Sequence, residues 1–300
     1  MIMKMYEKYD GWVKFTKIHY NTNTWIMLSI FSTILVVFGT IIFNVFVLDE
    51  INLLPVAFGS ATLVLTLGYP YMKKESIIDN IENNFSDALK QMADTLKAGD
   101  TYESALREVK DADYGRLSEE IGVALRRLEE GENIETALKG FSDSIDSRLV
   151  KRTMIILLDS IKTGSGLAAL LEDIAEDVRD THRLKEDRKA NTTMQFLFMI
   201  AAGGFIAPLI FGEVTAIMGL FSKIVTATMA DVTDTTSGFI LLLVQAYLLI
   251  EVIGSGIMMS IIREGNFNKS IIYIPVLLVI AYVSYYASSI VIGLMLTGAF

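Results

Sequence analysis

The 300-residue sequence contains no cysteine and only two histidines, and each scarcity removes a class of site. Without cysteine, the chain has no disulfide framework and no thiolate metal site. His19 and His182 are far apart and form no His-x-x-x-His pair, so zinc hydrolysis is not expected and both are interpreted as surface residues. We therefore expect neither a metal nor another cofactor.

Nucleotide motifs are also missing. Residues 162–166 (Lys-Thr-Gly-Ser-Gly) have the composition of a phosphate loop, but they lack the Gly-x-x-x-x-Gly-Lys-Ser/Thr order and no strand precedes them. We interpret this stretch as a helix break. Since there is no catalytic cluster either, we do not expect an enzyme, and the energy for any mechanical work must come from a partner.

Charge is shared unequally along the chain. The composition is 52% hydrophobic and 20% charged. Residues 73–190 hold 19 of the 26 Lys and Arg and 26 of the 35 Asp and Glu, a net charge of 19 minus 26, or −7. The sequence therefore predicts one charged segment between apolar regions.

The apolar regions contain five runs long enough to span a membrane, since about 20 apolar residues in a helix cross a hydrocarbon core of about 30 Å. The runs are Trp25–Val47, Ile51–Tyr71, Met194–Leu220, Phe239–Ile261 and Ile271–Leu296. No cleaved signal peptide is expected, because the stretch before the first run is polar and aromatic.

These runs divide the chain into four parts. They are an N-terminal segment (1–23), a hairpin of two membrane helices (24–71), a helical domain (72–193) and a membrane domain of three helices (194–300). The predicted fold is all-α, a polytopic membrane protein with about five transmembrane helices and a cytoplasmic helical bundle between the second and third.

Orientation in the cell membrane follows from basic residues beside the spans. Lysines precede the first span, and basic residues follow the second, precede the third and separate the fourth from the fifth. The opposite connections, including residues 221–237, are poor in Lys and Arg. We therefore expect the N-terminus and residues 72–193 in the cytoplasm and the C-terminus outside.

Three glycines punctuate the charged segment at intervals of 32 to 33 residues. Gly99, Gly131 and Gly164 each end an amphipathic run and are followed six and seven residues later by an apolar pair. Glycine can close a helix in the left-handed conformation, and a capping residue then starts the next helix. The predicted caps are Asp100 (in a capping box with Glu103) or Thr101, then Asn133, then Ser165. This spacing favours a compact helical bundle.

Within the bundle, apolar residues recur every three or four positions from Ile77 to Leu96, which predicts a helix with one buried face. Residues 149–161 form the most apolar helix and are placed at the centre of the bundle. The last helix starts at Ser165. Neither Pro nor Gly occurs from Leu167 to Ala202, so this helix is expected to continue straight into the third span.

The ordered set of motifs resembles the cytoplasmic domain of type II secretion system F proteins. It includes Asp87-Ala-Leu-Lys-Gln-Met-Ala-Asp-Thr-Leu-Lys-Ala-Gly99, Glu130-Gly-Glu-Asn-Ile-Glu-Thr-Ala-Leu138, residues 164–177 and Ile206-Ala-Pro-Leu209. The resemblance covers roughly residues 73–212. It departs from the common bacterial pattern because one domain is present rather than two, so the chain is more similar to the short platform proteins of tight-adherence and archaeal pilus systems.

The resemblance implies an inner-membrane platform of a type IV pilus, archaellum or secretion machine that works with a hexameric secretion ATPase and pilin-like subunits. The missing second copy favours a homo-oligomer, a dimer or higher, and no nucleic acid is expected as a partner. The alternative is a transporter or membrane receptor with a regulatory helical domain. Pro208 is the candidate helix-breaking residue of the third span.

Two sets of charged residues on the helical domain are candidates for docking the ATPase. One is the basic pair Arg126 and Arg127. The other is an acidic helix face, made of Glu172, Asp173, Glu176 and Asp177.

Glu251 near the middle of the fourth span is the candidate contact for a pilin helix. An ionisable group at such depth usually faces a protein interior with a partner. Gly254 and Gly256, about one turn away, would allow another helix to approach closely. The structural alternative is a protonated Glu251, or one bonded to a residue such as Tyr282.

Overall fold

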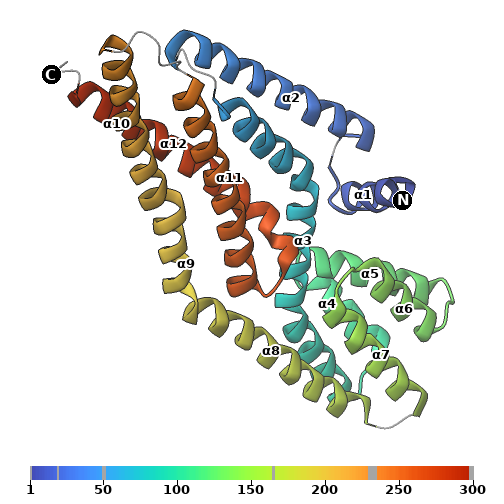
Figure 1. Cartoon of the computed structure of the whole chain (residues 1–300). Coiled ribbons are helices and arrows are strands. Elements are labelled where there is room, and N and C mark those ends of the chain that lie inside the picture. The colour runs from blue at the N-terminus through green and yellow to red at the C-terminus, as the bar shows by residue number, and fades with distance from the viewer. Residues whose placement is uncertain (1, 19, 49–51, 164–165, 229–234, 297–300) are drawn as a thin grey trace. The chain divides into compact units, whose positions relative to one another are not determined.

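The computed structural model describes residues 2–18, 20–48, 52–163, 166–228 and 235–296. Within these ranges the regular elements are helices and none is a strand (Figure 1). The predicted all-α fold class is therefore confirmed. The chain divides into two compact units, which we call the membrane unit (residues 1–72 and 188–300) and the charged unit (residues 73–187).

The boundaries between the units fall inside α3 and α8. The charged unit contains the second part of α3 (Leu54–Lys97), α4 (Tyr102–Asp111), α5 (Arg116–Glu129), α6 (Ile134–Ser144), α7 (Arg148–Thr163) and most of α8 (Leu167–Asn191). The membrane unit contains α1 (Ile2–Phe15), α2 (Thr22–Phe43), the π-helix η1 (Asn44–Leu48), the first part of α3, the end of α8, α9 (Thr193–Met199), the π-helix η2 (Ile200–Ile206), α10 (Ala207–Thr228), α11 (Thr235–Glu264), the 3₁₀ helix η3 (Phe267–Lys269) and α12 (Ser270–Leu296).

One apolar core holds the charged unit together. Ile81, Phe85 and Leu89 on the inner stripe of α3 are at most 1% exposed. They belong to one cluster with Leu106 of α4 and Leu125 of α5. Burial of such a side chain stabilises the fold by roughly 1.5–3 kcal/mol. Helices as short as α4 and α6 are marginal alone, so they depend on this shared core.

Gly99 and Gly131 follow the ends of α3 and α5 with φ of 93° and 94°. The Asp100 amide donates to the Thr95 carbonyl at 3.3 Å, and the Glu132 amide donates to the carbonyl five residues earlier at 3.0 Å. This is the Schellman arrangement, which satisfies helix-end carbonyls and needs a left-handed residue. Gly164 lies outside the described residues.

Polar side chains cap the next helices. Thr101 accepts from the Ser104 amide at 3.2 Å, and Asn133 accepts from the Thr136 amide at 2.7 Å. The alternative cap at Asp100, in a box with Glu103, is wrong because the Asp100 backbone closes α3. Ser165, the third predicted cap, lies outside the described residues.

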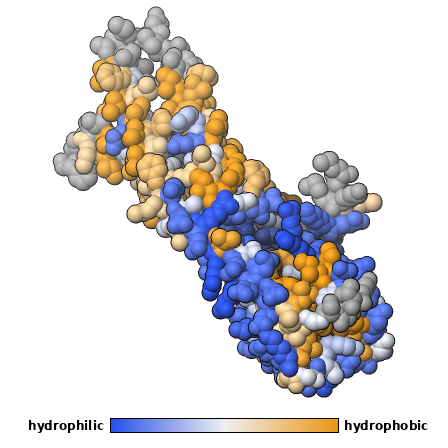
Figure 2. Space-filling model, turned by 90° about the horizontal axis from the view of Figure 1, so that it is seen from below, coloured by the Kyte–Doolittle hydropathy of each residue, from blue (hydrophilic) through white to orange (hydrophobic). Residues whose placement is uncertain are grey.

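The structure also corrects the position of α7, which we predicted at the centre of the bundle. Val150, Met154 and Leu157 are buried, but Ile155 is 68% exposed and Ile156 is 41% exposed. The helix is apolar on two faces, and the core covers only one of them. Figure 2 shows hydrophobic atoms grouped on the otherwise hydrophilic surface of the charged unit.

Four segments of the described chain are long and apolar enough to cross a membrane. They are Thr22–Phe46, Thr193–Ser222, Gly238–Glu264 and Phe267–Met295. The chain is thus a helical membrane protein. The predicted second span, residues 51–71, is not among the four, and from Leu54 onward it is the start of α3.

The start of α3 is less apolar than the other predicted spans because it is packed among helices. Ala57 and Ala61 are at most 3% exposed and belong to the membrane-unit core with residues of α11 and α12. Phe58 lies edge-on to Tyr282 of α12, with ring centroids 6.4 Å apart. Small residues allow such close packing in membranes, and a helix that faces protein needs fewer lipid-compatible side chains.

The expected unbroken helix from the charged unit into the third span is wrong, because α8 and α9 are separated at Thr192. The Thr192 backbone has φ −96° and ψ 3°. Its hydroxyl donates to the Arg188 carbonyl at 2.7 Å. Threonine hydroxyls that bond to a carbonyl one turn back commonly disturb a helix, which accounts for the break.

The third span contains the π-helix η2 directly before α10, where Pro208 is the second residue. Proline has no N–H, and inside an α-helix its ring clashes with the carbonyl four residues back. The wider turn of η2 lies where that clash would occur. Gly203 and Gly204 in η2 are buried, and a Cβ at Gly204 would come within 3.2 Å of Ile280 in α12.

We predict that Gly99→Val destabilises the protein by about 1–2 kcal/mol through backbone strain alone. A Cβ at Gly99 meets nothing within 4 Å, so crowding does not contribute. Ala98→Val is the matched control at an exposed neighbour. Thermal unfolding followed by circular dichroism should give a midpoint a few degrees lower for Gly99→Val than for the control, and equal midpoints would show that the left-handed conformation is not required.

Candidate functional site

Glu251 of α11 lies on a helix face directed at the third span. One turn before it, the ring centroid of Tyr247 is 5.2 Å from that of Phe211 in α10. One turn after it, Ser255 faces Gly203, where an added Cβ would come within 3.0 Å of the Ser255 Oγ. The two contacts show that the helices run antiparallel. Glu251 therefore lies level with the junction of η2 and α10.

The Oε2 atom of Glu251 is buried and has no hydrogen-bond partner in the described part of the chain. Tyr282, a possible structural partner, instead donates its hydroxyl proton to the carbonyl of Gln245 at 3.2 Å. An unpaired carboxylate within an apolar span costs roughly 2.5 kcal/mol or more. Protonation, or a partner from outside the described residues, removes this cost.

The two glycines after Glu251 have different surroundings. Gly256 is buried, and a Cβ there would come within 2.6 Å of Ile274 in α12, so its small size serves packing within the chain. A Cβ at Gly254 would meet nothing within 4 Å. Ile250, one turn before it, is 70% exposed. Glu251 thus borders an exposed apolar face of α11 on which Gly254 leaves room for another helix.

A second polar site in the membrane unit, centred on Gln245, was not predicted from the sequence. This side chain is fully buried. Its Oε1 accepts from the Leu53 amide at 2.6 Å, and its Nε2 donates to Asn52 Oδ1 at 3.0 Å. Asn52 in turn donates to Asn44 Oδ1 at 3.2 Å. The network joins the connection after α2 to α11. The feature of the sequence that could have predicted this site is a single Gln inside an apolar run.

Charged residues gather at the end of α11 that leads into η3. Arg188 Nε donates to the carbonyl of Ile262 at 3.1 Å, which satisfies a helix-end acceptor. Glu264 lies 3.4 Å from Lys189 and 3.2 Å from Lys269. The basic residues that flank the spans here are therefore partly committed to contacts within the membrane unit.

The predicted basic docking pair lies near the end of α5. Arg126 is exposed. Arg127 is half-buried, and its guanidinium lies so close to Gly140 of α6 that a Cβ there would come within 2.0 Å of Nη1. Arg126 is thus open to a partner, whereas Arg127 also packs against a neighbouring helix.

The predicted acidic docking face lies on α8, with all four carboxylates exposed. Glu172 forms an ion pair and hydrogen bond with Lys97 at the end of α3. This hydrogen bond, and then the charge of Lys97, lower the pKa of Glu172. Asp173, Glu176 and Asp177 form no such pair within the described residues. They are the part of this face available to a partner.

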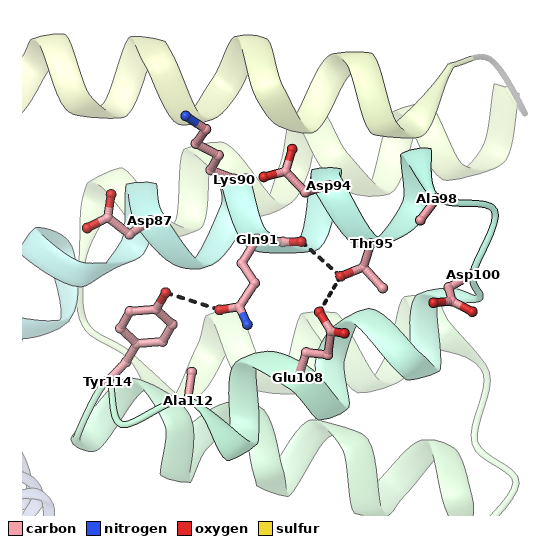
Figure 3. A pocket seen from close by; sticks show the side chains of 10 residues that line it. All are labelled: Asp87, Lys90, Gln91, Asp94, Thr95, Ala98, Asp100, Glu108, Ala112 and Tyr114. Atoms are coloured by element: carbon pink, nitrogen blue, oxygen red, sulfur yellow. Dashed lines mark hydrogen bonds between the residues drawn. The ribbon is translucent and has the colours of Figure 1, made fainter.

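An open groove of about 710 Å³ in the charged unit was not predicted. Figure 3 shows it between α3 and the segment formed by α4 and the turn after it. It is lined by Asp87, Lys90, Gln91, Asp94, Thr95, Ala98, Asp100, Glu108, Ala112 and Tyr114. Four lining side chains are acidic and one is basic, so the groove favours a cationic occupant. Its α3 residues lie on the face that periodicity assigns simply to solvent.

Hydrogen bonds fix the floor of the groove (Figure 3). The Thr95 hydroxyl lies 2.5 Å from Glu108 Oε2 and 3.0 Å from the Gln91 carbonyl oxygen, so its single proton is offered to one of them at a time. The Tyr114 hydroxyl donates to Gln91 Oε1 at 3.1 Å. Burial, and then the charge of Asp87, raise the pKa of Tyr114, which keeps it a donor.

The chain is similar to a protein family and to a curated protein. The family described as "Type II secretion system (T2SS), protein F" matches residues 88–215. "Flagella accessory protein J" of Methanococcus voltae is 24% identical over 216 residues, which cover 69% of this chain and 38% of that protein. The matched region thus spans about two fifths of the relative. No solved structure matches the chain.

Proposed function

Because residues 88–215 carry a domain of the type II secretion system protein F family, we propose that the chain is the membrane platform of a type IV pilus-like, archaellum-like or secretion machine. The family match carries the proposal, because it runs through the charged unit and into the third span. In this role the chain couples a hexameric secretion ATPase in the cytoplasm to the assembly or movement of pilin-like subunits. The ATPase, and not this chain, supplies the energy.

We propose that the chain crosses the cell membrane five times, with the start of α3 as a crossing in addition to the four apolar segments. The pairing of α2 with α3 supports this additional crossing. At one end of the pair, Trp25 Nε1 donates to the Thr66 carbonyl at 3.1 Å. At the other end, Asn52 donates to Asn44 at 3.2 Å. Since α2 is long and apolar enough to cross, the antiparallel start of α3 passes through the same depth. The basic flanks then put the charged unit in the cytoplasm and the C-terminus outside.

This topology predicts that a Thr235→Cys variant is labelled by a membrane-impermeant thiol reagent on intact cells. A Glu132→Cys variant should be labelled only after lysis. The chain has no cysteine of its own, so the unsubstituted protein is the blank. Labelling of Glu132→Cys but not Thr235→Cys on intact cells would reverse the topology.

The charged unit offers the ATPase three surfaces, namely the basic pair, the free part of the acidic face on α8, and the groove. Arg126 and the groove are open to a partner, and they carry opposite charge. Interfacial charge mainly sets association rate and specificity, and its effect is greatest at low salt. Reversing the charge of one surface at a time therefore tests which of them binds.

We predict that Arg126→Glu with Arg127→Glu reduces copurification of the ATPase roughly tenfold at low salt, about 1.4 kcal/mol. Asp87→Lys with Asp94→Lys tests the groove by the opposite change. Lys110→Glu, at an exposed position of α4 that belongs to none of the three surfaces, is the control. Circular dichroism should show that helicity is kept. Unchanged binding in the first variant would remove the basic pair as a docking site.

We place the contact with the apolar helix of a pilin-like subunit at Glu251 and at the exposed face of α11 beside it. The buried, unpartnered Oε2 supports this, since a group supplied by the subunit would satisfy it. Gly254 supports it as well, because an exposed glycine in a membrane helix allows close helix approach.

Glu251→Gln should reduce filament formation severalfold, because the amide keeps the shape and hydrogen bonding of the side chain but cannot carry its charge. Glu251→Asp should retain most filaments, and Ser255→Ala, one turn away on the same face, serves as the control. Filaments are counted by electron microscopy, with membrane insertion and ATPase binding measured in parallel. Normal filaments in Glu251→Gln cells would make Glu251 a structural residue.

A further inference from the structure

The exposed face of α7 is the most concentrated apolar surface of the charged unit. Five large hydrophobic side chains of its described residues are exposed, at Tyr102, Val123, Ile155, Ile156 and Leu184. Two of the five are adjacent on α7, and each of the others stands on a different helix. Exposed apolar side chains that stand together, rather than singly, mark a candidate interaction surface.

Two opposite charges flank the isoleucine pair at equal spacing along the helix. Arg152 lies three residues before Ile155, and Asp159 lies three residues after Ile156. All four side chains fall on one face of α7, opposite the buried Val150, Met154 and Leu157, and Arg152 and Asp159 are exposed. At 1.5 Å per residue, the two charges are about 10 Å apart with the isoleucines between them.

We propose that this face pairs with the same face of a second copy of the chain, with the two α7 helices antiparallel. A two-fold axis between Ile155 and Ile156 places Arg152 of each copy opposite Asp159 of the other. The same operation packs the isoleucines of both copies together at the centre. The apolar centre of one copy thus meets that of the other, and each charged end meets the opposite charge. An isologous interface requires such self-complementarity.

Self-complementarity favours a second copy over another protein. A different partner would need the reverse order of charges on its own helix, whereas a second antiparallel α7 supplies that order automatically. A lipid surface would gain from the isoleucines and Arg152 but not from Asp159, because anionic headgroups repel a carboxylate.

The test is disulfide crosslinking of full-length protein in native membranes. Ile155→Cys lies beside the proposed axis and should give a crosslinked dimer on mild oxidation. Leu184→Cys is the matched control, since Leu184 is 70% exposed against 68% for Ile155 but stands on α8 without the symmetric charges. Both variants start from a chain without cysteine, so any dimer comes from the introduced thiol.

Charge reversal then tests the symmetry. In the Ile155→Cys background, Arg152→Asp alone and Asp159→Arg alone should each lower the dimer yield about tenfold, because each places like charges opposite one another. The double reversal restores opposite charges across the axis and should recover the yield. Another protein on this face would not respond to the double change in this way.

Dimer from Ile155→Cys with recovery in the double reversal supports the proposal. Dimer from both cysteine variants alike, no dimer from Ile155→Cys, or no recovery in the double reversal overturns it. The inference specifies the homo-oligomer of the proposed platform. Crosslinking does not depend on filaments or on the ATPase, so its failure is distinguishable from failure of the proposed function.

Discussion

Polar groups inside the apolar helices must find their partners within the protein, because lipid offers none. The membrane unit depends on this constraint. Gln245 meets it by bonding to the connection after α2, and Tyr282 meets it through the Gln245 carbonyl. The Oε2 of Glu251 does not meet it among the described residues. Because the neighbouring polar groups are satisfied and this oxygen is not, Glu251 is the position in this unit that most strongly indicates a site for a partner.

The charged unit follows different rules, because its exposed residues are mostly polar or charged. Helices α3 and α5 end at left-handed glycines, α4 and α6 start at a threonine and an asparagine cap, and the helices give one face each to a common core. The remaining faces carry charge, and their differences distinguish one surface from another. The groove beside α3 is acidic, the end of α5 is basic, and among the described residues of this unit only α7 presents adjacent exposed isoleucines.

Local features of the sequence predicted the fold class and the buried stripe of α3, because periodicity and composition determine both. Features that depend on distant residues were not predictable. The Gln245 network joins positions almost 200 residues apart. Periodicity also did not tell which apolar face of α7 the core would cover. The choice between Asp100 and Thr101 as a cap depended on how α3 closes, and the break at Thr192 depended on a hydroxyl bond. The groove arises only when α4 packs beside α3.

The span that includes α2 has a further physical consequence. Only 11% of its most apolar stretch is buried within the chain, so most of this helix is open to lipid or to a partner. Its 25 residues extend about 37 Å, which exceeds a hydrocarbon core of about 30 Å. A helix that is too long for the bilayer relieves the mismatch by tilting or by thickening the lipid around it. The hydrogen bonds that hold Trp25 and Asn44 at its two ends limit how far this helix can tilt, so part of the mismatch is taken up by the lipid around it.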